Sequence, residues 1–100
     1  MCLCRFVTQF IGGGWVQNDE AVSAFDSVIN QMTVGHQYLL NEVGIDTAHA
    51  PVAGWQIDPF GASAATPRLF AEMGFTTHVI DRIPLRTHLD LMSTQQLEFT

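Results

Sequence analysis

The order of apolar segments along the chain predicts an α/β fold in which strands and helices alternate as strand, helix, strand, helix, strand. Three stretches rich in β-branched and aromatic residues, 5–11, 52–57 and 75–80, have the composition of strands. Two stretches with apolar residues at helical spacing lie between them. Such alternation predicts parallel strands joined by right-handed crossovers. We therefore expect part of a parallel, barrel-like (β/α) sheet within a single domain of 100 residues.

The first strand and the first helix have recognisable ends. Gly12 begins a run of three glycines that ends the strand, and Asn18 has the side chain of a helix N-cap. From Val22 to Val43, apolar residues recur at alternating spacings of three and four, which predicts one face of a long helix. Gly44 then has the residue type that commonly ends a helix.

The second strand and the second helix follow the same logic. Pro59 cannot donate to a ladder, so the second strand ends before it. Thr66 and Pro67 have the residue types of an N-cap and of the first helical position, and Gly74 ends the short helix that they begin. The third strand follows directly, and residues 96–99 are a candidate fourth strand.

Composition excludes several classes of partner and location. The net charge is −6 with four basic residues, so nucleic acid is not an expected partner. No apolar run approaches the roughly 20 residues that span a bilayer, so we expect no membrane span. Residues 1–15 have no basic leader before an apolar stretch, so we expect no signal peptide in this chain. Cys2 and Cys4 cannot form a disulfide framework, and we interpret them as half-buried strand residues.

Three side chains are candidates for a site because ligands bind at the carboxyl ends of parallel strands. Trp15, Asp58 and Arg82 each closely follow a predicted strand, so we expect them on one rim. Asp58 is the strongest candidate for chemistry; the alternative is an Asp that caps a turn before Pro59. Arg82 could clamp a carboxylate or sugar hydroxyls, or pair locally with Asp81. Trp15 could stack on a sugar face or serve packing alone.

The remaining charged and titratable residues point to structure rather than to a site. Asp19 and Glu20 are interpreted as charges at a helix start, where the helix dipole favours them. The histidines match no metal-ligand spacing, and His36 is best interpreted as a core histidine on the apolar helix face. The four histidines are His36, His49, His78 and His88.

Four strings then occur in a recognisable order. They read GGWVQNDEA (13–21), QMTVGHQYL (31–39), GWQIDPFG (54–61) and EMGF (72–75). Together, over residues 12–82, they resemble the lysosomal-type α-mannosidases of glycoside hydrolase family 38. By this resemblance, residues 1–100 form an internal fragment of the N-terminal catalytic domain of such an enzyme.

The resemblance implies a zinc-dependent enzyme that hydrolyses terminal α-mannose from glycans with retention. It implies that Asp58 is both the catalytic nucleophile and a zinc ligand, that Phe60 lines the substrate pocket, and that Arg82 lies near the nucleophile. Trp15 stays a further candidate for substrate binding. The resemblance also implies a lysosomal or secretory-pathway lumen, with the remainder of the parent enzyme as partner. A retaining enzyme needs two carboxyl groups roughly 5 Å apart, and the chain offers no identifiable general acid.

The chain also departs from the family pattern. Ala62 stands where the family usually has His, and Leu85 stands where an aromatic is frequent. The family's upstream His-x-Asp zinc pair and its late His ligand are absent from the sequence, so we expect the isolated chain to be inactive. A non-catalytic truncated remnant and a small α/β binding domain are the alternatives. The amount of exposed apolar surface distinguishes a fragment of a larger domain from a self-sufficient domain. A fragment should bind a hydrophobic dye, and a self-sufficient domain should bind little dye and melt cooperatively.

Overall fold

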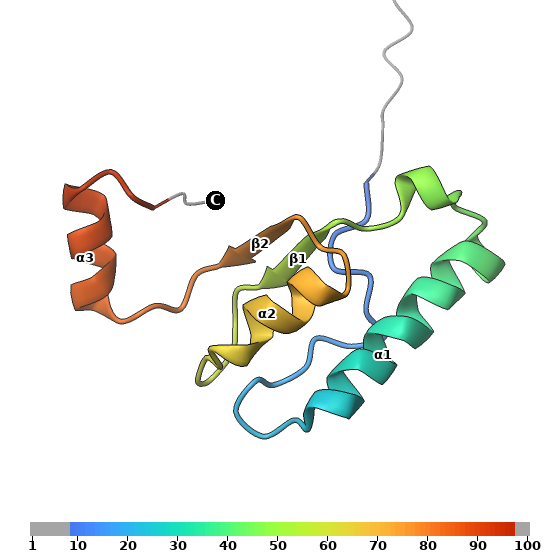
Figure 1. Cartoon of the computed structure of the whole chain (residues 1–100), viewed down its shortest axis with the longest axis horizontal. Coiled ribbons are helices and arrows are strands. Elements are labelled where there is room, and N and C mark those ends of the chain that lie inside the picture. Colours follow the sequence, from blue (N-terminus) through green and yellow to red (C-terminus); the bar gives the residue numbers. More distant parts are fainter. Residues whose placement is uncertain (1–8, 98–100) are drawn as a thin grey trace, which may run out of the picture.

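The computed structural model describes residues 9–97, which form a two-stranded parallel sheet flanked by helices (Figure 1). Its elements in chain order are helix α1 (Phe25–Tyr38), the π-helical turn η1 (Leu39–Val43), the 3-10 turn η2 (Thr47–His49), strand β1 (Ala53–Gln56), helix α2 (Ala65–Glu72), strand β2 (Thr77–Ile80) and helix α3 (Leu85–Ser93). The expected α/β class and the parallel pairing are confirmed, with Ala53 opposite Thr77 and Gln56 opposite Ile80. The described residues form no closed barrel.

The first predicted strand is only partly open to comparison, because residues 1–8 lie outside the described part. Residues 9–11 do not form a strand, but the segment borders the sheet, since the Gly12 N–H donates to the Ala53 carbonyl at 2.7 Å. The Val52 carbonyl faces β2, where it accepts from the Thr76 N–H at 2.8 Å. Because successive residues of a strand direct their backbone groups to opposite sides, Gly12 lies at the edge of β1 away from β2.

Helix α1 begins later than the sequence suggests, so the prediction that Asn18 caps it is wrong. The Ala21 N–H donates to Asp19 Oδ1 at 2.8 Å and closes a tight turn, and the helix starts only at Phe25. Local side-chain bonds of this kind compete with helix formation. Val22 is 83% exposed and therefore does not belong to the buried helix face. The predicted end at Gly44 is confirmed, where φ is +79° and the conformation is left-handed.

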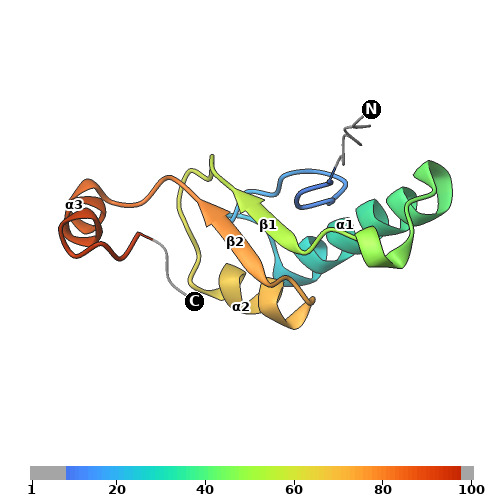
Figure 2. The ribbon, with the colours of Figure 1, turned by 90° about the horizontal axis from the view of Figure 1, so that it is seen from above.

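Helix α2 covers one face of the β1–β2 pair (Figure 2). It begins at Ala65, so the predicted N-cap Thr66 instead lies buried within the first turn, and the Ala65 N–H donates to Ser63 Oγ. Phe70, only 2% exposed, packs against β1 at Gly54, where an added Cβ would come within 2.7 Å of the Phe70 ring. The core consists of four buried side chains from α1, from α2 and from the loop between α2 and β2: Val28, Met32, Phe70 and Phe75.

Helix α3 is a feature that we did not predict. It stands apart from the sheet and the other helices in both ribbon views, and none of its residues is buried (Figures 1 and 2). The candidate fourth strand is wrong where it can be tested, because Gln96 and Leu97 are not in a strand; residues 98–100 lie outside the described part. Within residues 9–97, no helix has the length and apolar character needed to cross a membrane.

Candidate functional site

Asp58 and Arg82 meet at the carboxyl ends of the two strands. β1 ends at Gln56 and β2 at Ile80, and the register places these two residues opposite each other. Asp58 and Arg82 each lie two positions further on, and Arg82 Nη2 forms an ion pair with Asp58 Oδ1. Both side chains are about half exposed, at 56% and 55%. The expectation that these two residues share one rim is therefore confirmed.

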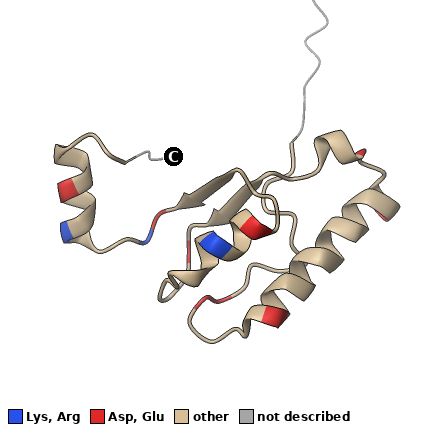
Figure 3. Ribbon diagram, in the orientation of Figure 1, with Lys and Arg blue, Asp and Glu red and all other residues tan. Residues whose placement is uncertain are grey.

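An aromatic ring completes this cluster. The Arg82 guanidinium carbon lies 5.6 Å from the centroid of the Phe60 ring, within the range of a cation–π contact. Phe60 is 77% exposed, so its ring faces solvent beside the ion pair. A flat apolar surface next to paired charges is the combination that sugar rings contact through their C–H faces and hydroxyls. Acidic and basic positions adjoin where β2 ends, as they also do on α2 and α3 (Figure 3).

The ion pair borders an open pocket of about 190 Å³. One side comes from the loop before α1 and the other from the end of β1 and the turn that follows. The lining residues are Gln17, Asn18, Asp19, Gln56, Asp58, Pro59 and Phe60. Sequence reasoning missed Gln17 and Asn18 as pocket residues, because Asn18 was explained as a helix cap. Asp19 likewise lies at the pocket rather than in the first turn of a helix.

Trp15 lies against α1 rather than in this pocket. Its ring is 61% exposed and meets the Tyr38 ring edge-on, with centroids 5.6 Å apart. The Trp15 N–H donates to the Gln31 carbonyl at 3.0 Å. Trp15 is thus not among the residues that line the Asp58 pocket, and its role in substrate binding stays a prediction.

The glycine-rich loop is seated directly on α1, which explains its glycines. His36 Nε2 lies 2.9 Å from the Gly12 carbonyl oxygen, so the interpretation of His36 as a satisfied, part-buried histidine is confirmed. A Cβ on Gly13 would lie 2.7 Å from the Pro51 ring, and a Cβ on Gly35 would lie 2.5 Å from the Trp15 nitrogen. Backbone therefore packs on backbone here, which only a residue without a Cβ allows.

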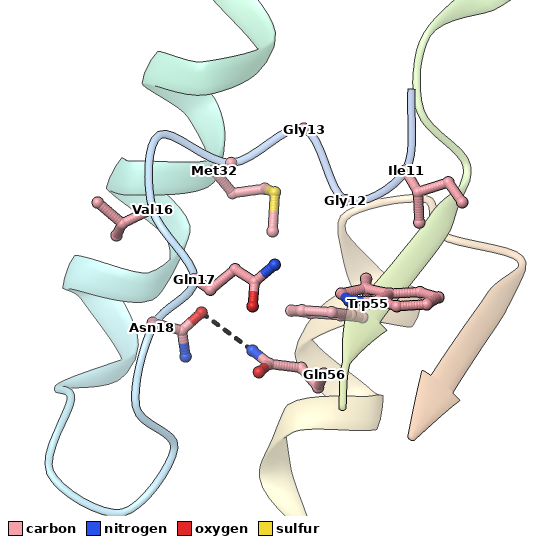
Figure 4. Close-up of a pocket in the computed structure, with 11 residues that line it drawn as sticks. Ile11, Gly12, Gly13, Val16, Gln17, Asn18, Met32, Trp55 and Gln56 are labelled. Carbon is pink, nitrogen blue, oxygen red and sulfur yellow. Dashed lines mark hydrogen bonds between the residues drawn. The ribbon is translucent and has the colours of Figure 1, made fainter. Parts of the chain in front are cut away.

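A second pocket, of about 100 Å³, lies between this loop and β1 (Figure 4). Asn18 and Gln56 project into it from opposite sides, and the Gln56 amide donates to Asn18 Oδ1 at 3.2 Å. Trp55 forms another part of the lining. The Asn18–Gln56 contact separates this pocket from the one at Asp58, since both residues line both pockets.

His78 is half-buried and lies outside these contacts. Its Nε2 is buried and makes no hydrogen bond within the described residues. Burial lowers the pKa of His78, and the nearby Glu20 carboxylate opposes the shift in part. The His78 ring packs against Phe70, with centroids 4.9 Å apart. The half-buried imidazole is therefore accounted for by its packing on Phe70.

The described residues do not by themselves make a metal centre. Residues 9–97 contain no group of three or more His, Cys, Asp or Glu side chains placed to hold a metal ion. A structural or catalytic zinc site needs three or four ligands, and Asp58 offers one carboxylate. Of its two oxygens, Oδ1 is engaged by Arg82, and Oδ2 makes no hydrogen bond to another described residue. The arrangement thus presents one carboxylate oxygen beside an open pocket.

The chain matches the Glycosyl hydrolases family 38 N-terminal domain over residues 5–100. It is 60% identical over 77 residues to "Alpha-mannosidase C" of Dictyostelium discoideum, a match covering 77% of this chain and 7% of that protein. It is 41% identical over 91 residues to "Lysosomal alpha-mannosidase" of Dictyostelium discoideum and 46% identical over 91 residues to "Epididymis-specific alpha-mannosidase" of Sus scrofa, each match covering 91% of this chain and 9% of the relative. The chain thus spans less than a tenth of the length of these relatives. It belongs to glycosyl hydrolase family 38.

Proposed function

We propose that this chain supplies the nucleophile-bearing part of a retaining α-mannosidase that removes terminal mannose from glycans. The observation that carries the proposal is the ion pair between Asp58 and Arg82 at the ends of neighbouring parallel strands, beside an open pocket. Membership of family 38 and relatives named as α-mannosidases give the substrate class. The position of Asp58 also suits the role, since strand ends are where α/β enzymes place reacting groups.

In the proposed reaction, a carboxylate oxygen of Asp58 attacks the anomeric carbon of the mannoside. The bond from that carbon to the leaving oxygen breaks, the leaving alcohol takes a proton from a general acid, and a glycosyl ester forms on Asp58. Water then cleaves this ester with retention of configuration. An attacking carboxylate must be ionised, and the Arg82 guanidinium beside Asp58 is a charge partner for that carboxylate. Phe60 offers an apolar face to the sugar ring.

Zinc and the general acid enter the proposal through residues beyond this chain. Asp58 would be one zinc ligand, but the described residues do not complete a site. The remainder of the parent enzyme would supply the other ligands and the acid. Ala62 and Leu85, which depart from the family pattern, are both in the described part, and Leu85 is 73% exposed.

The location of the protein is proposed on the same basis. One relative is named a lysosomal α-mannosidase, and we place this chain in the lysosome or the secretory-pathway lumen. The alternatives, a non-catalytic remnant or a small α/β binding domain, require a chain that covers its own large apolar side chains. Large apolar side chains left exposed throughout the described part, such as Val22, Phe25 and Phe60, favour a segment of a larger domain.

A chimera tests the proposal. The segment of the Dictyostelium α-mannosidase C that matches this chain would be replaced by the residues of this chain, and hydrolysis of an aryl α-mannoside would be measured. We expect the chimera to be active, and Asp58→Asn to lower kcat by more than about a hundredfold. Asp81→Asn is the matched control, because Asp81 is an exposed carboxylate one residue from Arg82. A folded chimera without activity, or an equal loss from both substitutions, would overturn the proposal in favour of a non-catalytic role.

A further inference from the structure

Three side-chain amides connect α1 to the strand that carries Asp58. Asn18 Oδ1 accepts two hydrogen bonds, one from Gln31 Nε2 at 3.3 Å and one from Gln56 Nε2 at 3.2 Å. Figure 4 shows the second of them. Gln31 lies on α1, Asn18 on the loop before it, and Gln56 at the end of β1. Gln56 is 4% exposed, so its amide has little access to water as a substitute partner. These three residues are called the amide relay below.

The direction of every bond in the relay follows from one backbone group. The Val16 N–H donates to Gln31 Oε1 at 3.2 Å, and a backbone N–H can only donate. The other end of the Gln31 amide must then be its donor, Nε2, which faces Asn18. The Asn18 atom that receives it is therefore an acceptor, and the Gln56 atom that shares this acceptor must be a donor. The orientations of three amides are thus fixed without ambiguity.

We propose that the amide relay positions Asp58, and that Asn18 acts as the acceptor on which this positioning depends. Gln56 is the last residue of β1, Asp58 lies two residues further on in the turn that follows, and both line the same pocket. A fixed Gln56 side chain therefore fixes the start of the turn that holds Asp58. Asn18 makes no contact with the reacting atoms in this scheme and is a positioning residue. The inference rests on the proposed role of Asp58 as nucleophile.

The directions of these hydrogen bonds predict which substitutions of Asn18 keep the amide relay and which disrupt it. Asn18→Asp keeps acceptors for both glutamine donors, so the relay should survive. Asn18→Ala removes the shared acceptor and leaves two donors unpaired, one of them on the buried Gln56. Gln31→Glu combined with Asn18→Asp would set two carboxylates against each other, and this double variant should lose the relay. A role in helix capping would instead show no dependence on Gln31 or Gln56.

The first test uses this chain and measures no activity. Side-chain amide signals of Gln31 and Gln56, and backbone amide signals of Ile57 and Asp58, would be followed by nitrogen-15 NMR. Asn18→Ala should move all four, Asn18→Asp should leave Ile57 and Asp58 near their original positions, and Asn30→Ala on the exposed face of α1 should change none. Unchanged Ile57 and Asp58 signals in Asn18→Ala would overturn the proposal, whatever the chimera does.

The second test uses the active chimera and separates kcat from KM. If the relay favours the positioned Asp58 by about the free energy of one hydrogen bond, its loss should lower kcat about five- to tenfold and leave KM within about twofold. We expect this fall in Asn18→Ala and in the Gln31→Glu/Asn18→Asp double variant, and recovery in Asn18→Asp. Equal kcat values for Asn18→Ala and Asn30→Ala would overturn the proposal. An inactive chimera would remove the proposed function while the NMR test still decides the relay.

Discussion

Gly35→Ala is the substitution that most directly tests how the glycine-rich loop is seated on α1. A Cβ at this position would lie 2.5 Å from the Trp15 nitrogen, and the Gly13 carbonyl oxygen and the Gly14 carbonyl carbon lie closer still. Ordinary contacts to a Cβ begin at 3.4 Å, so the loop and the helix must separate by about 1 Å. The obstructing atoms belong to the backbone and cannot rotate away.

The net cost follows from three terms. Overpacking of a tight interface costs about 1–3 kcal/mol. Stretching the bond from the Trp15 N–H to the Gln31 carbonyl, now 3.0 Å, adds about 1 kcal/mol. Replacing Gly by Ala inside a helix returns about 1 kcal/mol. We therefore expect Gly35→Ala to lower the free energy of unfolding by about 1–3 kcal/mol, although propensity alone predicts a gain.

Urea unfolding followed by circular dichroism measures this change, and hydrogen exchange at the Trp15 amide locates it. Asn30→Ala is the matched control, because it raises helix propensity on the exposed face of the same helix. We expect Asn30→Ala to be neutral or slightly stabilising, with unchanged protection at Trp15. The reasoning about loop seating fails if Gly35→Ala is as stable as Asn30→Ala and the Trp15 amide stays equally protected.

Three further perturbations test the core, the buried histidine and α3. Phe70→Ala should cost about 3–5 kcal/mol in urea unfolding, because this ring is 2% exposed at the centre of the small core. Burial lowers the pKa of His78, so the neutral form contributes stability above the unfolded pKa of about 6.5 that is lost as pH falls below it; the drop in unfolding midpoint from about pH 8 to pH 5 should shrink in His78→Gln. The apolar stripe of α3 should bind a hydrophobic dye, and replacing Leu85, Leu89 and Met92 by Ser should reduce the fluorescence.

The parallel pair and the meeting of Asp58 with Arg82 could be predicted because each depends on short-range signals. Strand composition locates β1 and β2, and a crossover of this length leaves parallel pairing as the expected arrangement. Once the strands pair in register, residues two positions past each strand end must be neighbours. Trp15 was expected on the same rim because it closely follows the first predicted strand, but residues 9–11 form no strand and the loop that carries Trp15 follows the surface of α1.

The early start predicted for the first helix shows where local signals mislead. Asn18 has the residue type of a cap, yet its oxygen accepts from Gln31 and Gln56, 13 and 38 positions away in the chain. A sequence pattern within a few residues contains no information about such partners. Helix α3 is a different case, since Leu85, Leu89 and Met92 recur at spacings of four and three. This spacing is typical of one face of a helix, so the sequence does contain a signal for α3.

The contacts that position the pocket residues connect Asp58 to sequence segments far from it in the chain. None of the residues that line the Asp58 pocket comes from α1. The helix nevertheless sets the loop through Gln31, Gly35 and His36, and the loop in turn sets Gln56 through Asn18. The contacts are short, polar and directional, so a shift of α1 changes the loop and the strand end together. If Asp58 is the nucleophile, as proposed, its exact placement therefore depends on a helix that contributes no residue to the pocket.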